Sequence, residues 1–451
     1  MNRLAVALLL FAFAGACEHT ETSTDEISPE ALLRRPAEEM LILDVRTADE
    51  YTAGHVPGAI NISHEQLADR LDELDGYRAS YVVVYCHSGK RAGIARNLLV
   101  ENGFSVLHLS GDMSGWREAA HPIAKPDLAA RAGLAESAAA IFGVLPDAAP
   151  NANNPLSDAK IELGRMLYYE PRLSKNHDIS CNSCHGLDNY GQDNQPNSPG
   201  HKGQRGGRSS PSVYNAALHL AQFWDGREPD VEAQAKGPIL NPIKMAMPSS
   251  DAVVALLSSI PGYVEAFAAA FPEDEPSLTY DNLGLAIGAF ERRLLTPSRF
   301  DDFVAGQLLA LHEKEVGGLN TFIQVGCVTC HLGPAVGGSL YRKLGLVQAY
   351  PTADSGRFAV TANKADHAVF KVSSLRNIAK TSPYLHDGSV ETLPEMVRIM
   401  GRHQLGTALS PAQVKSIASF LASLTGRVDA EYISMPALPE SGPNTPAPDP
   451  S

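Results

Sequence analysis

The chain has 451 residues, a formal net charge of −14 and a hydrophobic fraction of 44%. This length predicts two to four domains, and the hydrophobic fraction is ordinary for a soluble protein. The acidic balance and the lack of a basic cluster argue against nucleic acid as a partner.

The first residues predict an exported protein. A short basic segment ends at Arg3, and the apolar run from Leu4 to Ala14 has the length of a signal-peptide core and is too short to span a membrane. Residues 1–16 are therefore interpreted as a signal peptide, followed by Cys17 as a lipidated mature N-terminus. Ordinary cleavage at the same bond is the alternative, because Ala14 stands where lipoboxes usually carry leucine. Both interpretations place the protein in the periplasm, with a lipid anchor as its only expected tie to a membrane.

An α/β domain is predicted over residues 27–124, after a polar tether at residues 17–26. Its apolar runs are short and rich in β-branched residues, which indicates buried parallel strands. One further segment has helical periodicity and stops at a glycine. The predicted elements are strands at Met40–Val45, Tyr81–Cys86 and Ser105–Leu109 and a helix at Arg91–Asn102.

Two parts of this domain resemble the rhodanese (sulfurtransferase) family: Leu43–Arg46 with Glu50–Asn61, and the loop Cys86–Arg91. The loop lies between a strand and a helix, so backbone N–H groups and the helix N-terminus favour a thiolate. The resemblance implies that Cys86 accepts sulfur and that Arg91 and the loop amides cradle it. Four residues separate Cys86 from Arg91, as in rhodaneses, whereas related phosphatases have a longer loop. The sulfur donor stays open, and an inactive module for binding or sensing is the alternative.

The rest of the chain reads as mainly helical. Residues 125–153 predict a linker with an Ala-rich helix, and the proline-rich residues 429–451 predict a disordered tail. Between them, helical segments alternate with long loops rich in Gly, Pro and Asn. We divide this part into two domains, residues 154–295 and 296–428.

Two Cys-x-x-Cys-His motifs predict two covalently bound haem c groups. In such a motif the cysteines form thioethers with the haem vinyl groups and the histidine ligates the iron. A zinc knuckle or redox dithiol is a weak alternative, because both motifs end in histidine. With Cys17 and Cys86, the motif cysteines account for all six in the chain and leave none for a disulfide. The haem-attaching cysteines are Cys181, Cys184, Cys327 and Cys330, and the proximal ligands are His185 and His331.

The expected fold is thus multidomain, an α/β rhodanese-like domain followed by two mainly α-helical c-type cytochrome domains. Ordered segments from Asn154 to Arg427 resemble the bacterial di-haem cytochrome c peroxidase family, which includes the methylamine-utilisation-type enzymes. The resemblance implies reduction of hydrogen peroxide to water with electrons from a small periplasmic donor, a cytochrome c or a cupredoxin. Family members are often homodimers. The matching segments are Leu163–Ser174, Ile179–His185, Ala221–Arg227, Gln234–Pro238, Gly356–Thr361 and Leu375–His386.

The resemblance implies different sixth ligands for the two haems. His201, between two glycines that would let its loop swing, matches the releasable distal ligand of the first haem. A plain loop histidine is the alternative, and His177 and His219 are weaker rivals. Met400 matches the sixth ligand of the second haem, where a thioether raises the reduction potential. A core methionine is the alternative there, and Met396 is the competitor.

The same resemblance implies roles for residues between the haems. Trp224 matches an aromatic electron relay, although packing alone would also explain it. Thr381 and Pro383 match carbonyl donors to a calcium ion, but Ser209 replaces the usual asparagine ligand and is a weaker donor.

Lys244 is the main departure from the family pattern. The family carries a glutamate there, which is thought to move a proton between the peroxide oxygens. A carboxylate can accept and return a proton near neutral pH, whereas an ammonium can only donate. Gln234, the other polar group of the distal pocket, is present. Two alternatives therefore stay open: an oxidoreductase of other specificity, such as sulfur-compound oxidation through Cys86, and a non-enzymatic electron-transfer or redox-sensing protein.

Overall fold

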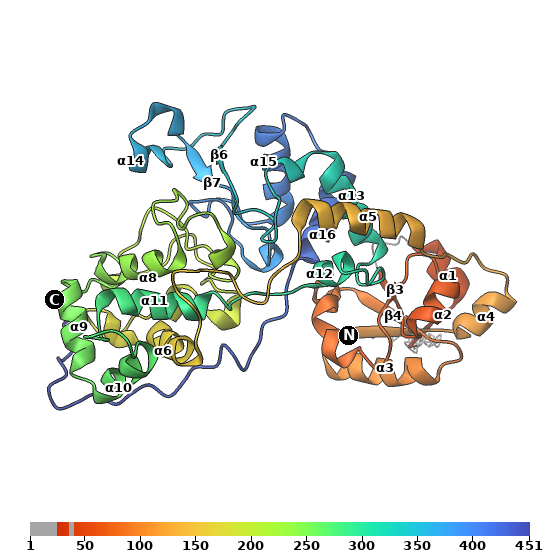
Figure 1. Cartoon of the computed structure of the whole chain (residues 1–451). Coiled ribbons are helices and arrows are strands. Elements are labelled where there is room, and N and C mark those ends of the chain that lie inside the picture. The colour runs from red at the N-terminus through yellow and green to blue at the C-terminus, as the bar shows by residue number, and fades with distance from the viewer. Residues whose placement is uncertain (1–24, 36–39) are drawn as a thin grey trace, which may run out of the picture. The chain divides into compact units, whose positions relative to one another are not determined.

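The computed structural model describes residues 25–35 and 40–451. It divides into two compact units, Met1–Pro126 and Asp127–Ser451 (Figure 1). Cys17 and the predicted signal peptide lie outside the described residues. In the described part, no single helix is long and apolar enough to span a membrane, and the two helices that would be long enough together meet at a bend of 106°.

The first unit is built on a five-stranded sheet in the order β1-β5-β4-β2-β3, with parallel pairing throughout. The predicted α/β domain and its three longer strands are confirmed. Two edge strands of two residues each were not predicted, because so short a run leaves no periodic pattern. One of them begins inside the predicted tether, at Glu26. The strands are β1 (Glu26–Ile27), β2 (Met40–Asp44), β3 (Ile60–Asn61), β4 (Tyr81–Tyr85) and β5 (Ser105–Leu109).

The sheet places Cys86 at the carboxyl end of a buried strand. Strands β2 and β4 are buried at nearly every position, as expected for parallel strands with both faces covered. Because β4 ends at Tyr85, Cys86 begins the loop that enters the next helix. The helices of this unit are α1 (Pro29–Arg34), α2 (Ala48–Ala53), the 3-10 helix η1 (Ala68–Tyr77), α3 (Lys90–Glu101) and α4 (Asp112–Glu118).

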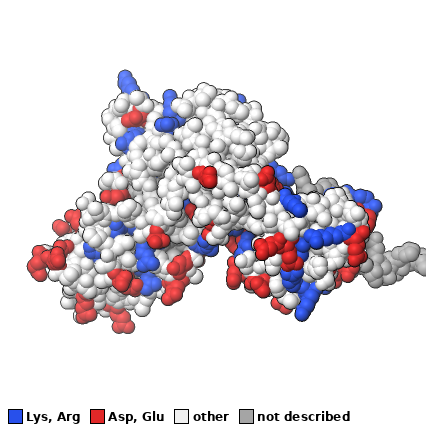
Figure 2. All heavy atoms as spheres, turned by 45° about the vertical axis from the view of Figure 1, so that its right-hand side comes forward, with Lys and Arg blue, Asp and Glu red and all other residues white. Residues whose placement is uncertain are grey.

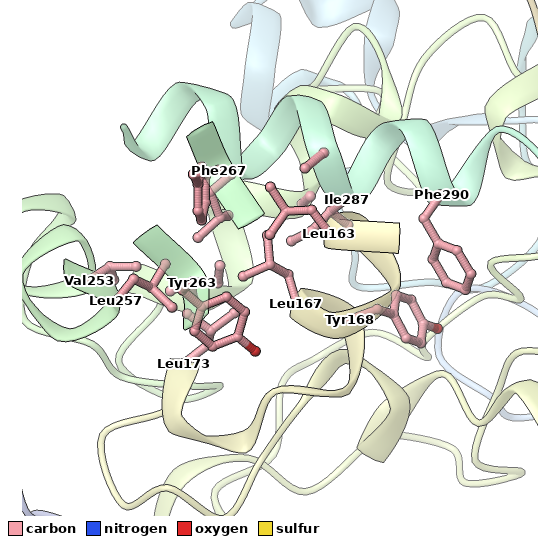
Figure 3. Close-up of a cluster of buried hydrophobic side chains, with 14 of the residues drawn as sticks. Leu163, Leu167, Tyr168, Leu173, Val253, Leu257, Tyr263, Phe267, Ile287 and Phe290 are labelled. Carbon is pink, nitrogen blue, oxygen red and sulfur yellow. The ribbon is translucent and has the colours of Figure 1, made fainter. Parts of the chain in front are cut away.

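Within the second unit, residues 154–295, which we predicted as the first haem domain and refer to by that name, have a helical core in which α6 (Asp158–Tyr169) packs on α11 (Tyr280–Glu291) (Figure 3). Leu167 and Ile287 are fully buried there. Gly164 lies where the helices meet, because a Cβ at this position would collide with a carbonyl oxygen of α11. The other helices are η2 (Pro171–Leu173), α7 (Cys181–Cys184), η3 (Leu187–Asn189), η4 (His201–Gly203), η5 (Ala216–Leu218), α8 (Val231–Leu240), α9 (Ser250–Ser258) and α10 (Pro261–Ala270).

The second haem domain repeats this arrangement. Helix α13 (Glu313–Gln324) packs on α16 (Pro411–Ala422), and a Cβ at Gly318 would collide with the carbonyl oxygen of Ser416. A short antiparallel pair of strands lies in the same domain. Its remaining elements are α12 (Arg299–Val304), η6 (Cys327–Thr329), β6 (Tyr341–Lys343), α14 (Phe358–Thr361), η7 (Lys364–Asp366), β7 (Val369–Lys371), η8 (Ile378–Lys380) and α15 (Leu393–Gln404).

The helix predicted inside the linker exists, but it belongs to the core of the second haem domain. Helix α5 (Leu128–Phe142) buries Phe142, whose ring meets that of Phe300 edge to face at 5.2 Å. Arg131 is 3% exposed and donates to the carbonyl oxygen of Leu311 at 2.9 Å. The interpretation of residues 125–153 as a linker is thus corrected. Alanine composition predicts the helix, but it does not say what the helix packs against.

The proline-rich segment 429–451 packs against the first haem domain. Tyr432 stacks on Phe290 at 5.1 Å and donates to its carbonyl oxygen at 2.8 Å. Farther along, Arg172 donates to the carbonyl oxygen of Pro439 at 2.8 Å. The predicted disorder is therefore wrong. Proline suppresses regular structure, but neighbouring side chains can still satisfy the carbonyl groups of an extended segment.

Charged side chains of both signs are distributed over the surface. On the face drawn in Figure 2, Lys and Arg residues lie among Asp and Glu residues. Exposed ion pairs account for part of this mixture, such as the one between Arg78 and Asp75 at 3.0 Å. Such pairs contribute little to stability because water screens them.

Candidate functional site: two haem-attachment motifs

Both Cys-x-x-Cys-His motifs form one helical turn. In the first, the N–H of His185 donates to the carbonyl oxygen of Cys181 at 3.0 Å. In the second, the N–H of His331 donates to the carbonyl oxygen of Cys327 at the same distance of 3.0 Å. No disulfide joins any of the four motif cysteines to another described cysteine. A single turn brings both thiols and the imidazole together, as attachment to the two vinyl groups of one haem requires.

His185 is held as an axial ligand should be. Its Nδ1 lies 3.0 Å from the carbonyl oxygen of Pro211, so this hydrogen bond assigns the proton to Nδ1 and leaves Nε2 available for iron. Tyr168 donates to the carbonyl oxygen of His185 at 2.7 Å. Burial, and to a smaller degree the charge of Lys244, lowers the pKa of His185. A lowered pKa favours the neutral ring that a metal needs.

The second motif lines an apolar cavity of about 250 Å³. Burial lowers the pKa of His331 to about 4, although nearby carbonyl groups of Val336 and Ser373 oppose this. Burial also raises the pKa of the Cys327 thiol to about 12. Met396 and Met400 both line the cavity, one turn apart on α15. The choice of Met400 as the sixth ligand thus remains a prediction.

These residues fit two haem c groups. Each motif has the closed turn, and the second also has an apolar cavity with thioether sulfur among its lining residues. Cys181 and Cys184 with His185 would hold one haem, and Cys327 and Cys330 with His331 the other. A bound haem would supply an iron that changes oxidation state and, where a sixth position is open, binds a small oxidant.

The loop of His201 lies against the segment that contains Lys244. The N–H of His201 donates to the carbonyl oxygen of Lys244 at 2.7 Å. Gly200 has no room for a side chain, because a Cβ there would collide with the carbonyl oxygen of Ile243. His201 is 6% exposed, and its Nε2 lies 3.3 Å from a main-chain carboxylate oxygen of Ser451. Iron ligation by His201 remains a prediction.

The rival histidines lie in different surroundings. His177 is partly buried, and burial lowers its pKa. His219 lines the cavity of the second motif instead of facing the first, and its Nδ1 lies 2.8 Å from Nζ of Lys371. A role of either histidine as a ligand of the first haem is not supported by these contacts and stays a weaker alternative to His201.

Lys244 lies near the first motif, as the sequence predicts. Burial raises the pKa of Cys184, and the positive charge of Lys244 opposes this rise. Lys244 acts on His185 as well, so its ammonium group is close to both residues. Gln234 is partly buried on α8, the helix that leads into this segment. The roles of Lys244 and Gln234 toward peroxide remain predictions.

Trp224 is fixed at both edges. Its Nε1–H donates to the carbonyl oxygen of Ser209 at 2.9 Å, and its ring meets that of His386 at 6.4 Å. The cavity of the second motif is also lined by the three predicted calcium-binding residues, Ser209, Thr381 and Pro383. Gln192 donates to the nearby carbonyl oxygen of Ser382 at 3.1 Å. Calcium binding remains a prediction.

The loop after β4 holds the thiol of Cys86 in a polar frame. The N–H of Gly89 donates to its Sγ at 3.1 Å. Arg91, predicted to cradle the sulfur, donates to both oxygens of Glu50 at 2.7 and 2.8 Å and also interacts electrostatically with Cys86. Arg91 lowers the pKa of Glu50 to about 2.

Asp112 and His108 support Cys86 and were missed by sequence reasoning. Asp112 accepts from the N–H of Cys86 at 2.8 Å, and its other oxygen lies 3.1 Å from Nε2 of His108. Asp112 has a φ of +52°, in the left-handed region. The only hint in the sequence is Gly111-Asp112 after a strand, since both residue types favour turns.

Comparisons with known proteins agree with this geometry. The family model for di-haem cytochrome c peroxidase matches residues 158–308, and the model for the rhodanese-like domain matches residues 28–119. The cytochrome c551 peroxidase of Pseudomonas aeruginosa is 43% identical over 336 residues, which are 73% of this chain and 95% of that protein. The cytochrome c551 peroxidase of Nitrosomonas europaea is 45% identical over 288 residues, 63% of this chain and 85% of that protein. A crystal structure of a MauG-like protein associated with microbial copper homeostasis is similar with a TM-score of 0.58 and 29% identity, over 65% of this chain and 97% of that chain.

Proposed function

The chain belongs to the di-haem cytochrome c peroxidase family and carries a rhodanese-like domain before the haem domains; on this premise we propose that it reduces hydrogen peroxide to water with electrons from a small periplasmic redox protein. It is an enzyme of the cytochrome c peroxidase type with two haem c groups. The donor, a cytochrome c or a cupredoxin, and the sulfur chemistry of the first domain are part of the proposal.

The observation that carries the proposal is the difference between the surroundings of the two motifs. The first motif has Lys244 beside it, and the glycine-flanked loop of His201 lies against the segment that contains Lys244. The second lines an apolar cavity with two methionines. This difference supports one iron with a releasable ligand and one with a permanent thioether ligand, the pair that a two-electron reduction needs.

At the first motif, His185 keeps its Nε2 available because Nδ1 is bound to Pro211. His201 would ligate the iron of a haem held here and be released when its loop moves, and Gln234 would orient peroxide through its side-chain amide. Lys244 can donate a proton from Nζ, but while charged it cannot take one from peroxide. We therefore propose slower turnover than in relatives that carry a carboxylate at this position.

Electrons enter at the second motif and pass along Trp224. The hydrogen bond to Ser209 and the edge contact with His386 hold the indole in one orientation, which keeps the path length constant. A thioether ligand from Met400 would raise the reduction potential of a haem held at the second motif, which would suit it to storing one electron.

The test uses the full-length protein with both haems attached. The half-reduced form is mixed with hydrogen peroxide, and peroxide loss and the haem spectrum are followed together. We expect one haem to become five-coordinate on half-reduction and peroxide to be consumed within the mixing experiment. A low-spin spectrum of both haems after half-reduction, with no peroxide loss, would instead support an electron-transfer or sensing protein. Peroxide inertness with a five-coordinate haem would support another substrate, such as a sulfur compound.

A second activity is proposed for the first domain, because the Gly89 N–H donates to Sγ of Cys86 inside a rhodanese-like loop. The Cys86 thiolate would attack the outer sulfane sulfur of a donor of the thiosulfate type, forming a persulfide at Cys86 while the donor's S–S bond breaks and sulfite leaves. The loop amides and Arg91 would stabilise the persulfide charge. The sulfur donor is left open. We further propose a periplasmic location with a lipid anchor at Cys17, a calcium ion near Thr381, and assembly as a homodimer.

A further inference from the structure

Lys371 is a buried cation without a carboxylate partner. It ends strand β7, is 7% exposed, and lines the cavity of the second motif. Burial is the sole influence on its pKa, which it lowers to about 7, and no acidic group of the described residues counters this. Its side chain lies 2.8 Å from Nδ1 of His219. Burying such a group without an anion is unfavourable, so the cavity is expected to receive one.

The hydrogen bond between these side chains fixes the orientation of His219. In its charged form Lys371 can only donate, so Nδ1 of His219 then accepts and the ring proton sits on Nε2. That Nε2 is buried and has no hydrogen-bond partner among the described residues. The pair therefore presents a cation and an unsatisfied N–H donor to the same cavity. A carboxylate oxygen satisfies both groups.

Both side chains are held in place by the backbone around them. The imidazole of His219 packs so closely on Gly338 that a Cβ there would collide with the ring. The N–H of Lys371 donates to the carbonyl oxygen of Trp224 at 2.8 Å. His219 and Trp224 belong to the first haem domain, and Lys371 belongs to the second. The pair thus joins the two haem domains at one point of the cavity.

We infer that Lys371 and His219 together bind a propionate carboxylate of the second haem. This haem is held by Cys327, Cys330 and His331, which line the same cavity, and its two propionates are the carboxylates that it brings. The ammonium of Lys371 donates to one propionate oxygen, and the Nε2–H of His219 donates to the same carboxylate. The inference rests on haem attachment at the second motif and holds whether or not peroxide is the substrate.

The test measures the reduction potential of the second haem by spectroelectrochemical titration of the full-length protein. Lys371→Met removes the cation, and Lys343→Met, on the exposed neighbouring strand β6, is the matched control. Loss of a positive charge beside the haem stabilises the ferric form. In Lys371→Met we expect the ferric-to-ferrous ratio of the second haem at a fixed potential to rise about tenfold. For a one-electron couple this is a decrease of about 59 mV in the reduction potential. The control is expected to keep the potential of the wild type.

Two further variants keep the inference testable if Lys371→Met fails to retain the second haem. Lys371→Arg preserves the charge and should keep the potential. His219→Leu leaves the lysine but removes the imidazole N–H donor, and it should lower the potential by a smaller amount than Lys371→Met. An unchanged potential in Lys371→Met with both haems attached overturns the inference. If that variant cannot be prepared, an unchanged potential in His219→Leu overturns it. Because none of these measurements uses peroxide, failure here is separate from failure of the proposed peroxidase activity.

Discussion

The backbone N–H of His201 donates a hydrogen bond of 2.7 Å to the backbone carbonyl of Lys244. The residue that replaces the carboxylate expected in the family therefore also anchors the loop of the predicted distal ligand. Because the anchor is a backbone group, a side-chain substitution at Lys244 should leave it intact. The proton-transfer role of this position can thus be tested without disturbing the loop.

Lys244→Glu is expected to increase peroxidase activity. A carboxylate at this position could accept and return a proton, an effect typically worth about 10² to 10⁴ in rate. The measurement is kcat for peroxide-dependent oxidation of a reduced small cytochrome c. Lys244→Gln is the control, since it removes the charge but supplies no base and should show no comparable gain. Equal rates for the Glu and Gln variants would show that a base at position 244 does not assist peroxide reduction.

Deletion of residues 440–451 is expected to loosen the loop of His201. In this chain, Nζ of Lys175 donates to a main-chain carboxylate oxygen of Ser451 at 2.9 Å, and that oxygen lies 3.3 Å from Nε2 of His201. Without these contacts the loop opens more often, so its amide hydrogens should exchange about tenfold faster. Hydrogen exchange read by mass spectrometry checks this. Asp449→Ala, which removes one tail side chain only, should have a smaller effect, and unchanged exchange in the deletion would contradict the prediction.

Cys86→Ser should abolish sulfur transfer from thiosulfate to cyanide, by at least about 10²-fold, because a hydroxyl cannot form a persulfide. Cys86 is 2% exposed, so serine should fit without disturbing the domain. Peroxidase activity of the same protein serves as the internal control and should not change. If wild type and variant transfer sulfur alike, Cys86 is not the acceptor.

Asp112→Ala should weaken the same loop. The substitution removes the acceptor of the Cys86 N–H and leaves alanine at a φ of +52°. Loss of a hydrogen bond to a charged group costs about 1.5–3 kcal/mol, and the left-handed backbone adds strain. Chemical denaturation of the first unit and sulfurtransferase kinetics check this. Asp112→Asn, which keeps an acceptor oxygen, should retain more of both.

Gly164→Ala should destabilise the first haem domain although alanine favours helices. The gain in helix propensity is about 1 kcal/mol, but the new Cβ would collide with the carbonyl oxygen of Ala286, and overpacking costs about 1–3 kcal/mol. Gly133→Ala is the matched control, since a Cβ at this position of α5 meets nothing within 4 Å. The Tm of thermal unfolding should fall in Gly164→Ala and rise in Gly133→Ala. Equal stabilisation of both would contradict the close contact of α6 with α11.

Glu291→Gln should stabilise the protein increasingly as pH rises from about 4 to 8. Burial, and then the charge of Glu232, raises the pKa of Glu291 to about 8, above its usual value of about 4.3 in an unfolded chain. Below pH 4 both states are protonated, and no difference is expected. Between pH 4 and 8 only the unfolded state ionises, which favours unfolding of the wild type by up to a few kcal/mol.

Denaturant titrations of Glu291→Gln at pH 4 and pH 8 check this window. The exposed Glu265 of α10 provides a control, and Glu265→Gln should show no such pH dependence. A stabilisation by Glu291→Gln that is equal at both pH values would assign the effect to packing instead of ionisation.

Local patterns in the sequence determined the chemistry of this protein and much of its first domain. The motifs that begin at Cys181 and Cys327 can be recognised from five consecutive residues, because a single turn must hold both thiols and the histidine. Likewise, the runs at Met40 and Tyr81 predicted parallel strands, since burial on both faces demands continuous apolar residues. Composition did not predict which segments pack against the rest of the protein. The alanines of α5 and the prolines of residues 429–451 do not reveal the surfaces on which they lie.

Only the tertiary structure brought distant groups together. It placed Asp112 at Cys86, the tail at His201, and His219 beside Lys371, pairs separated by 26, 250 and 152 positions in the chain. None of these pairs has a periodic or local signature, because each depends on how separate segments cross. Burial then decided their chemistry: away from water, an unpaired cation or N–H group needs a partner, and only the folded chain shows which groups lack one.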